Sequence, residues 1–453
     1  MAKGARRGYQ CNACGERTPK WAGQCPECGQ WNTLIEAEPP AAAGPRDTGV
    51  PDPSRAPRTW DIAEIGTERE ARLPTGIGEL DRVLGGGLVE GSAILLGGDP
   101  GIGKSTLLLQ AMAALAGAPS VLYVTGEESL SQVTLRARRL GVEDSGVRLL
   151  AETNVERILD AAADNAPGVM VIDSIQTIFR GDSQSAPGAI AQVRDSASAL
   201  VRYAKARGTA LFLVGHVTKE GHLAGPRVLE HMVDTVLYFE GEGGSRWRVI
   251  RAIKNRFGAV NELGVFAMGD HGLKPVANPS ALFLSRHDEP VPGSVIMVTR
   301  EGTRPLMVEV QALVDISALS NPRRVALGLE QNRLSMLLAV LHRHAGVAMT
   351  DQDVYVNVVG GVRIGETAAD LAVLAACLSS LRDRPVPADT ALFGEVGLAG
   401  EIRPVPNGEE RLREAGKHGF ARVILPQANA PRHPPSGLEV IPVARLAQVL
   451  DVC

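Results

Sequence analysis

The sequence contains few aromatic residues, no long apolar run and no excess of positive charge. Aromatic side chains make up 4% of the 453 residues, which argues against a stacking platform of the OB or RRM kind. No stretch approaches the ~18 apolar residues of a membrane span, and the N-terminal "MAKGARRGYQ" lacks the apolar core of a signal peptide, so we expect a cytoplasmic protein with no membrane partner. The net charge of −4 excludes binding to nucleic acid through bulk charge, so any such binding must be local.

Cysteine is also scarce, and four of the six cysteines are grouped near the N-terminus. Cys11, Cys14, Cys25 and Cys28 form two C-x2-C pairs separated by ten residues. Each pair can form a knuckle that presents two thiolates, and two knuckles complete a tetrahedral Zn²⁺ site. Disulfides are the alternative, which adjacent pairs in a cytoplasmic chain disfavour. Four sulfur ligands leave no open position, so we expect a structural zinc whose binding drives the folding of a small ribbon.

The middle of the chain shows the pattern of a parallel α/β sheet. Four apolar runs, "SAILLGG", "SVLYVTG", "GVMVIDS" and "TALFLVGH", alternate with helical patterns. Three further runs, "MVDTVLYFEG", "RWRVIRAIKN" and "LGVFAMGDHGL", follow one another without helices and predict consecutive strands. Beyond residue 285 a mixed pattern includes a long helix predicted near Leu329–His344.

A nucleotide site is predicted where the first of these runs ends. The residues "GDPGIGKS" fit G-x-x-x-x-G-K-[ST] between a strand and a helix, a context that a chance glycine-rich turn lacks. Backbone N–H groups of such a loop surround phosphates, Lys104 reaches the β- and γ-phosphates of ATP, and the Ser105 hydroxyl binds Mg²⁺. The candidate nucleotide-binding residues are Gly98, Asp99, Pro100, Gly101, Ile102, Gly103, Lys104, Ser105 and Thr106.

Carboxylates at two other strand ends supply the remaining groups for hydrolysis. Asp173 ends the run "VMVID" and is the candidate second magnesium ligand, with a helix cap as the alternative. Glu127 and Glu128 end the run after the P-loop helix, and we expect Glu127 to act as base or to orient water. The alternative is that both glutamates are the acidic start of the next helix.

Two cations occupy alternate positions at the end of "RWRVIRAIKN". Lys254 and Arg256 should therefore point to one face. The residues near the P-loop contain no basic side chain that could act as a finger on the γ-phosphate. A solvated strand face, or contact with a DNA backbone, is the alternative role for the pair.

The segment "LPTGIGELDRVLGGGLVEGSAILLGGDPGIGKST" resembles the RecA-like core of RecA, KaiC and DnaB-type ATPases. With the four-cysteine ribbon in front and "KNRFG" behind it, the whole chain resembles the RadA/Sms family of bacterial recombination proteins. This resemblance implies a DNA-dependent ATPase that assembles as a homo-hexameric ring. It also implies the family role, which is to drive branch migration of strand-exchange intermediates begun by the RecA recombinase on single-stranded and branched DNA.

The resemblance also implies roles for individual residues. Lys254 and Arg256 would project into the nucleotide site of the neighbouring subunit, where a finger supplied in trans stabilises the transferring phosphoryl group. His216 occupies the strand end where relatives often carry Gln as a relay between nucleotide and DNA. Lys219 and Arg227, in the polar loop that follows, are the candidate contacts to DNA phosphates, although any exposed loop cation looks the same.

The last third of the chain resembles the proteolytic domain of Lon but lacks its catalytic pair. Ala368 stands at the position of the nucleophilic serine and Glu409 at that of the lysine base. Thr367 with Lys417 is a weak substitute pair, so we expect no protease activity and a scaffold that holds the ring in register. Arg323, Arg324 and Arg363 are possible DNA-contacting cations of this scaffold.

The sequence therefore predicts an α/β protein with a RecA-like P-loop ATPase core of mostly parallel sheet, a small N-terminal zinc ribbon and a C-terminal Lon-protease-like α+β domain. The predicted limits are 1–36 for the ribbon, 37–58 for a flexible linker, 59–284 for the ATPase and 285–453 for the scaffold. The alternative functions are an ATP-dependent protease of the Lon type and a nucleotide-gated DNA clamp that does not translocate.

Overall fold

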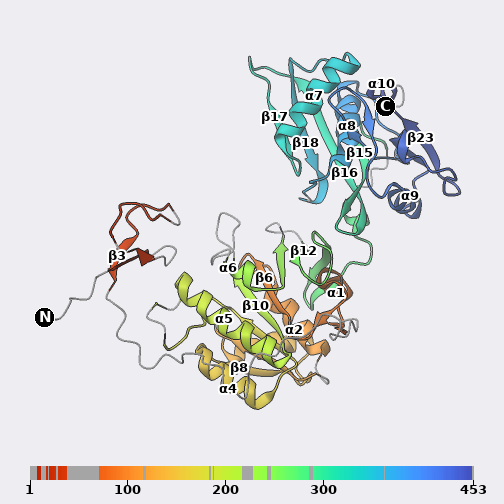
Figure 1. Cartoon of the computed structure of the whole chain (residues 1–453). Coiled ribbons are helices and arrows are strands. Elements are labelled where there is room, and N and C mark those ends of the chain that lie inside the picture. Colours follow the sequence, from red (N-terminus) through yellow and green to blue (C-terminus); the bar gives the residue numbers. More distant parts are fainter. Residues whose placement is uncertain are drawn as a thin grey trace, which may run out of the picture. The chain divides into compact units, whose positions relative to one another are not determined.

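The computed structural model describes two compact units that meet in sequence near residue 275 (Figure 1). The described residues are 8–11, 17–18, 20–26, 29–37, 71–115, 119–182, 185–186, 188–216, 228–241, 246–284, 289–361 and 363–450. Among these residues, no helix combines the length and the apolar character needed to cross a membrane.

The N-terminal ribbon is a three-stranded antiparallel sheet. Its strands are β1 (Gly8–Cys11), β2 (Arg17–Thr18) and β3 (Leu34–Ala37), in the order β2-β1-β3. Cys11, Cys25 and Leu34 form its small buried cluster, against which Tyr9 packs. Apolar burial this limited cannot stabilise a fold alone, so the ribbon fits the predicted dependence on zinc.

A nine-stranded sheet forms the centre of the first unit, in the order β14-β13-β12-β11-β6-β10-β9-β7-β8. The strands β11, β6, β10, β9, β7 and β8 are parallel, and β11 and β12 are antiparallel. Their bounds are β6 (Ala93–Gly98), β7 (Val121–Thr125), β8 (Arg148–Ala151), β9 (Val169–Asp173), β10 (Ala210–His216), β11 (Thr235–Glu240), β12 (Trp247–Asn255), β13 (Leu263–Gly269) and β14 (Gly272–Pro275). The apolar runs identified in the sequence form β6, β7, β9 to β13; β8, a partly exposed edge strand, was not predicted.

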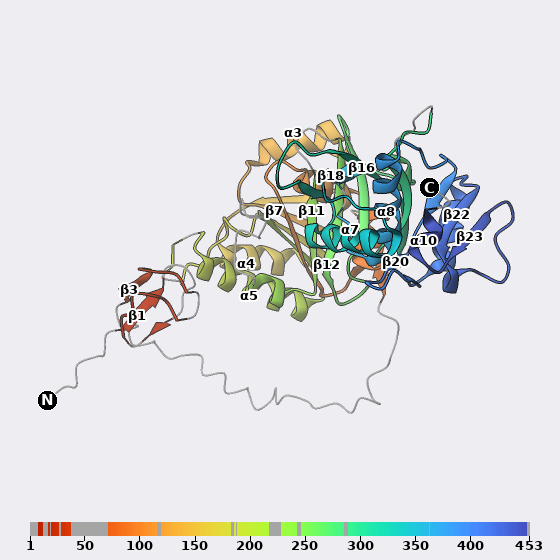
Figure 2. The same ribbon diagram turned by 90° about the horizontal axis from the view of Figure 1, so that it is seen from above.

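Helices cover both faces of this sheet. On one face lie α1 (Gly78–Leu84), α2 (Lys104–Leu115) and α3 (Leu130–Leu140); on the other lie α4 (Val155–Asn165), α5 (Ile190–Arg207) and α6 (Val228–Met232). Figure 2 shows α3 on one side of β7 and β11, with α4 and α5 on the other. Along β6, Ile94 and Leu96 pack with α2, and Ala93 and Leu95 with α5, because successive side chains of a strand face opposite ways. A short pair, β4 (Arg72–Leu73) with β5 (Leu88–Val89), adjoins α1 in sequence.

The second unit is built on a seven-stranded sheet in the order β17-β18-β16-β15-β19-β22-β23. The strands are β15 (Ser294–Glu301), β16 (Arg304–Ile316), β17 (Arg324–Leu327), β18 (Gln352–Val358), β19 (Thr390–Leu392), β22 (Arg422–Pro426) and β23 (Glu439–Val443). Its helices are α7 (Gln331–Ala345), α8 (Asp370–Leu381), α9 (Gly408–Lys417) and α10 (Leu446–Val449), and a short pair joins β20 (Glu395–Val396) to β21 (Ile402–Arg403). The long helix predicted near Leu329–His344 is α7.

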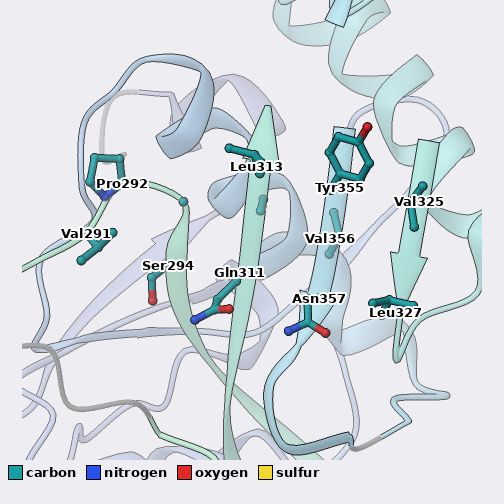
Figure 3. A pocket seen from close by; sticks show the side chains of 12 residues that line it. Val291, Pro292, Ser294, Gln311, Leu313, Val325, Leu327, Tyr355, Val356 and Asn357 are labelled. Carbon is teal, nitrogen blue, oxygen red and sulfur yellow. The ribbon is translucent and has the colours of Figure 1, made fainter. Parts of the chain in front are cut away.

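One face of this sheet is covered only in part. Leu412 of α9 packs on it with Val298 of β15 and Met307 of β16. Leu313 lies six residues beyond Met307 on β16 and so belongs to the same face. The side chains there line a shallow pocket of about 350 Å³ that spreads over β16, β18 and the edge strand β17 (Figure 3). Leu313 and Leu327 are each 60% exposed.

Candidate nucleotide site and intersubunit cations

The ends of four parallel strands bring the predicted hydrolytic residues to one edge of the sheet. His216 at the end of β10 pairs in register with Gly98 at the end of β6. Asp173 at the end of β9 pairs with Thr125 at the end of β7, which is followed by Gly126 and then by the two glutamates. The carboxyl ends of parallel strands are where α/β sheets bind ligands, so this edge is the candidate nucleotide site.

The P-loop has the backbone that its glycines predict. Gly98 has φ +155°, and a Cβ there would lie 2.6 Å from the Phe239 carbonyl oxygen, so glycine is required. The Lys104 amine donates to the carbonyl oxygens of Gly98 and Asp99, at 2.7 and 2.9 Å. Burial lowers the pKa of this amine, and the nearby carboxylates of Asp173 and Glu127 act in the opposite direction. The amine thus rests within the loop, next to the place where phosphates would lie.

His216 links the P-loop lysine to the candidate water-orienting carboxylate. Its Nδ1 lies 3.3 Å from the Lys104 amine, and its Nε2 lies 3.1 Å from Oε1 of Glu127. A protonated lysine can only donate, so Nδ1 accepts and Nε2–H is left to donate to Glu127. His216, which we expected to relay between nucleotide and DNA, therefore contacts both Lys104 and Glu127 of the nucleotide site.

Glu127 and Glu128 have different surroundings. The α3 helix begins at Leu130 with Ser129 as its N-cap, which accepts from the backbone N–H of Gln132, so both glutamates precede the helix. Glu128 forms a bidentate ion pair with Arg136, at 2.5 and 2.6 Å. Glu127 instead accepts a hydrogen bond from the buried Ser174 hydroxyl. This difference supports Glu127, rather than Glu128, as the carboxylate available for chemistry.

Asp173 is buried at the end of β9, where its Oδ2 accepts a 2.5 Å hydrogen bond from the Tyr123 hydroxyl. Complete burial, together with the charge of Asp173, raises the pKa of Tyr123 well above its ordinary value, so the phenol stays a donor. This leaves the other oxygen of Asp173 for a cation. A carboxylate oxygen and the Ser105 hydroxyl are hard oxygen ligands of the kind Mg²⁺ prefers, so the residues present fit the ion.

Lys254 and Arg256 both turn towards the segment that joins α6 to β11. The Lys254 amine donates to the carbonyl oxygens of Glu230 and Val233, each at 2.7 Å. Arg256 pairs at 3.2 Å with Asp234, a buried carboxylate that also lies 3.4 Å from the amine of Lys205. Desolvation, with the charge of Arg256, lowers the pKa of Lys254.

The other residues of "KNRFG" fasten this strand end to α1. Asn255 donates to the carbonyl oxygen of Val83 at 3.1 Å, and Arg72 donates to that of Phe257 at 3.0 Å. A Cβ at Gly85 (φ +85°) would lie 2.7 Å from the Phe257 oxygen, so the two backbones touch. The motif is therefore a rigid base for two cations.

The two cations lie at the opposite edge of the sheet from the chain's own P-loop. Thr235 pairs both with Asn255 of β12 and with Ile94, the second residue of β6, whereas the P-loop follows Gly98 at the end of β6. At about 3.3 Å per residue, the four residues from Ile94 to Gly98 put roughly 13 Å of strand between the two edges. Neither cation can act on a phosphate bound by its own P-loop.

A basic side chain that the sequence analysis overlooked does lie at the P-loop. Arg248, near the start of β12, donates from Nε to the carbonyl oxygen of Ile102 at 3.1 Å. Arg248 thus binds the backbone of the loop, and the expectation that no basic side chain near the P-loop could act as a finger on the γ-phosphate stays a prediction. Because β12 runs antiparallel to β11, its first residues return to the edge where β6 ends, which only the strand pairing reveals.

Several predicted residues fall outside the described part of the chain. These are the zinc ligands Cys14 and Cys28 and the DNA-contact candidates Lys219 and Arg227. The other two zinc candidates, Cys11 and Cys25, are buried together in the ribbon, which fits a shared metal. In the second unit Arg324 donates to the carbonyl oxygens of Gln352 and Met349, and Arg363 is exposed.

The candidate residues of a protease site have different surroundings. Ala368 is buried, and Glu409 pairs with Arg413 on the exposed side of α9. Thr367 donates to Glu395 at 2.6 Å, while Lys417 lies 4.0 Å from Glu414. No hydrogen bond joins Thr367 to Lys417 among the described residues, so the substitute nucleophile and base are not assembled.

Protein-family models match three parts of the chain. An AAA domain matches residues 61–222, a rubredoxin metal binding domain matches 9–36, and a model described as subunit ChlI of Mg-chelatase matches 322–429. These matches agree with the predicted fold: an AAA, RecA-like P-loop domain, an N-terminal zinc ribbon and a C-terminal ChlI/Lon-like domain.

Curated relatives match the whole chain. DNA repair protein RadA of Pseudomonas aeruginosa is 63% identical over 451 residues, covering 100% of this chain and 99% of the relative. The proteins of the same name from Escherichia coli and Bacillus subtilis are 56% and 48% identical, with 99% or more of this chain and 99% of each relative covered. Together with the P-loop, the ribbon and the "KNRFG" base, these matches show that the chain belongs to the RadA family of DNA repair proteins.

Proposed function

We propose that this chain is a DNA-dependent ATPase of recombinational repair that works as a hexameric, DnaB-type ring. The ring would move on single-stranded and branched DNA and drive branch migration of strand exchange begun by a RecA recombinase. The observation that carries the proposal is the position of Lys254 and Arg256. The contacts of the "KNRFG" strand end with α1 hold their backbone in place, and they lie a strand's length from their own P-loop. They suit a nucleotide bound by a neighbouring subunit.

Binding of ATP would begin with the P-loop lysine. The Lys104 amine is held by two loop carbonyls and His216, and the phosphates of ATP would replace these weaker acceptors. Ser105 and Asp173 would hold Mg²⁺, which neutralises charge that develops on the phosphates. The Tyr123 hydroxyl keeps Asp173 oriented and, as a neutral donor, leaves the carboxylate its charge.

Glu127 would orient the attacking water. Ser174 and His216 hold this carboxylate from two sides, so its free lone pairs point in a restricted direction. A positioned general base contributes about 10²- to 10⁴-fold to a rate. When the Lys104 amine binds the γ-phosphate instead of His216, the imidazole loses the hydrogen bond at Nδ1. Because Nε2 of the same ring contacts Glu127, nucleotide binding would be coupled to the position of that carboxylate.

Arg256 and Lys254 would complete the pocket of the next subunit. An arginine supplied in trans stabilises charge on the transferring phosphoryl group and is worth about 10³- to 10⁵-fold. Arg256 is paired with Asp234 in the single chain, and its side chain is 57% exposed, so it is accessible to a neighbour. Lys254 is less exposed, and to reach the neighbour its amine would leave the carbonyl oxygens of Glu230 and Val233.

The second unit would be a ring scaffold without protease activity. Ala368 cannot attack a carbonyl group, and exposed Glu409 cannot act as an amine base. The open apolar face over β16, β18 and β17 supports self-association of this unit. We also propose the four-cysteine zinc site, DNA contacts at Lys219 and Arg227, a bacterial cytoplasmic location and the domain limits 1–36, 37–58, 59–284 and 285–453.

Mixing two inactive variants tests catalysis in trans. Glu127→Gln removes the water-orienting group and Arg256→Ala removes the finger, so each variant alone should lose at least about 100-fold of the ATPase activity stimulated by single-stranded DNA. In a random one-to-one mixture, about a quarter of neighbouring pairs combine an intact Glu127 with an intact Arg256, so activity should return to that level.

A matched mixture serves as the control. Glu127→Gln with Lys104→Ala damages two groups of the same pocket and should give no recovery if Arg256 alone is supplied in trans. Absence of recovery with Arg256→Ala, under conditions where subunits exchange, would reject the intersubunit assignment. ATPase activity that DNA does not change would instead favour the nucleotide-gated clamp.

A further inference from the structure

Two tryptophans of the ribbon lie outside its core. Trp21 is 57% exposed and Trp31 is 69% exposed, although burial of an indole is among the most favourable contributions to folding. The buried cluster of the ribbon consists instead of Cys11, Cys25 and Leu34. The whole chain has only four tryptophans, so half of them lie in this short segment.

In the segment around the second cysteine pair, both indole rings approach Gly23. Gln24 and Trp31 form an isolated antiparallel bridge, and the N–H of Asn32 donates to the Gly23 carbonyl oxygen at 2.7 Å. A Cβ at Gly23 would lie 3.5 Å from the ring of Trp31 and 3.9 Å from that of Trp21. Both aromatic rings therefore approach the same residue, to within about the distance of van der Waals contact with a Cβ.

Zinc binding would make this arrangement rigid. The N–H of Cys25 donates to the Gln30 carbonyl oxygen, and the N–H of Gly29 donates to that of Cys25, each at 2.9 Å. The candidate ligand Cys25 thus lies in the same hydrogen-bonded turn as Trp31. Rings held in place before binding lose little conformational entropy when a partner docks.

The described side chains beside the two rings are mostly polar, and Lys20 among them is a cation. Lys20, Gln24, Gln30 and Asn32 are exposed beside them, and Ile35 is the other large apolar residue exposed among the described residues of the ribbon. The core of a protein interface is largely apolar, whereas the described side chains exposed beside these rings are mostly polar.

We propose that Trp21 and Trp31 form a stacking platform for unpaired bases of single-stranded DNA, with the exposed Lys20 beside them attracting the phosphates. Aromatic rings and local positive charge are together the chemistry that binds single strands without reading their sequence. The inference rests on the proposed DNA-dependent function and adds a contact outside the ATPase unit. It also refines the argument from composition, because few aromatics in the whole chain still allow a local pair.

Fluorescence of the full-length, zinc-loaded chain tests the platform. In a background with Trp60→Phe and Trp247→Phe, only the two ribbon indoles emit. Oligo(dT) should quench them, whereas an abasic oligonucleotide of equal length, which has the phosphates but no bases, should not. Trp21→Ala or Trp31→Ala should weaken binding of oligo(dT) about tenfold and leave abasic binding unchanged, while Trp→Phe at either position should restore most of the affinity. Ile35→Ala, which removes another exposed apolar side chain of the ribbon, should have no effect.

Each outcome decides between partners. Emission that ignores oligo(dT) while DNA still stimulates the wild-type ATPase overturns the platform and leaves the proposed function standing. Absence of stimulation in the wild type counts against the proposed function, and quenching by oligo(dT) in that case still supports the platform. Emission that changes with protein concentration in the absence of DNA overturns the inference in favour of a protein surface covering the indoles. Zinc content equal to that of the wild type shows that each variant keeps its ribbon folded.

Discussion

Ser174 shows how much of this site depends on a single side chain without a motif of its own. It is buried after Asp173, at a cis peptide bond, and its hydroxyl donates to Glu127. Hydrogen bonds to a charged group are worth about 1.5–3 kcal/mol, enough to decide which way a carboxylate points. Ser174 is a positioning residue, because it acts on water only through Glu127.

Ser174→Ala should therefore lower kcat about tenfold or more and leave KM for ATP unchanged, since binding depends on the P-loop. Ser174→Thr, which keeps the hydroxyl, should recover most of the loss. Thr177→Val is the matched control, because the Thr177 hydroxyl bonds the Ser174 carbonyl oxygen at 2.8 Å and not Glu127. Equal loss of kcat in Ser174→Ala and Thr177→Val, measured in DNA-stimulated steady-state assays, would indicate a structural effect only.

Cys377 is a second residue whose environment sets its chemistry. It is fully buried in α8, and burial raises the pKa of its thiol to about 12 because the thiolate is poorly solvated there. Alkylation requires the thiolate, so iodoacetamide at about pH 8 should leave Cys377 unlabelled in the native protein and label it in denaturant. Peptide mass spectrometry measures both. Native labelling at the denatured rate would show that α8 opens readily.

The α9 helix carries one buried and one exposed arginine, and the two have different effects on how the helix is held. Its Arg411 is buried, where it forms a bidentate pair with Glu366, at 2.6 and 2.8 Å, and donates to the Val298 carbonyl oxygen at 2.7 Å. Its Arg413 pairs with Glu409 at 3.2 Å in solvent. The first arginine joins α9 to β15 and to the segment before α8, whereas the second joins the helix only to itself.

Arg411→Met should lower the free energy of unfolding by about 3 kcal/mol, because Glu366 is left without its cation in a partly buried site. Arg413→Ala, the matched control, should cost less than about 0.5 kcal/mol. Urea unfolding, combined with hydrogen exchange of the α9 peptides, assigns the loss to the second unit. Similar effects of the two substitutions would mean that the buried pair does not stabilise this helix.

At the scale of the whole molecule, two features are incomplete in a single chain. Lys254 and Arg256 have no phosphate within reach, and the pocketed face of the second unit exposes Leu313 and Leu327 beside the edge strand β17. Both features are explained if copies of the chain associate. We expect the apolar face to contribute to the ring and the cations to work only within it.

Leu327→Asp should then shift the protein from hexamers to smaller species and lower the DNA-stimulated ATPase activity along with them, because a charge would be buried at the contact. Leu398→Asp is the control, since Leu398 is 70% exposed in the same unit but does not line the pocket. Light scattering of the eluted protein measures the mass. Intact hexamers with Leu327→Asp would place the ring contacts elsewhere.

Much of the fold follows from short-range pattern. Apolar runs with helices between them predicted the parallel strands, and the loop "GDPGIGKS" predicted the P-loop with its lysine. The edge strand β8 was missed because its burial is mixed, and Arg248 was missed because its return to the P-loop depends on antiparallel pairing. Tyr123 and Ser174 were missed because one looks like a core residue of a strand and the other follows a motif without belonging to it.

By itself, then, the sequence determined which chemical groups this protein has: two cysteine pairs, a phosphate loop, strand-end carboxylates and two alternating cations. These groups are recognised from spacings of a few residues, because a strand or a turn fixes the direction in which each side chain points. Tertiary structure alone decided their partners, because Lys104 meets His216 across 112 residues, Tyr123 meets Asp173 across 50 and Ser174 meets Glu127 across 47. Contacts of that range arise from the order of strands in the sheet, and no local pattern in the chain encodes that order.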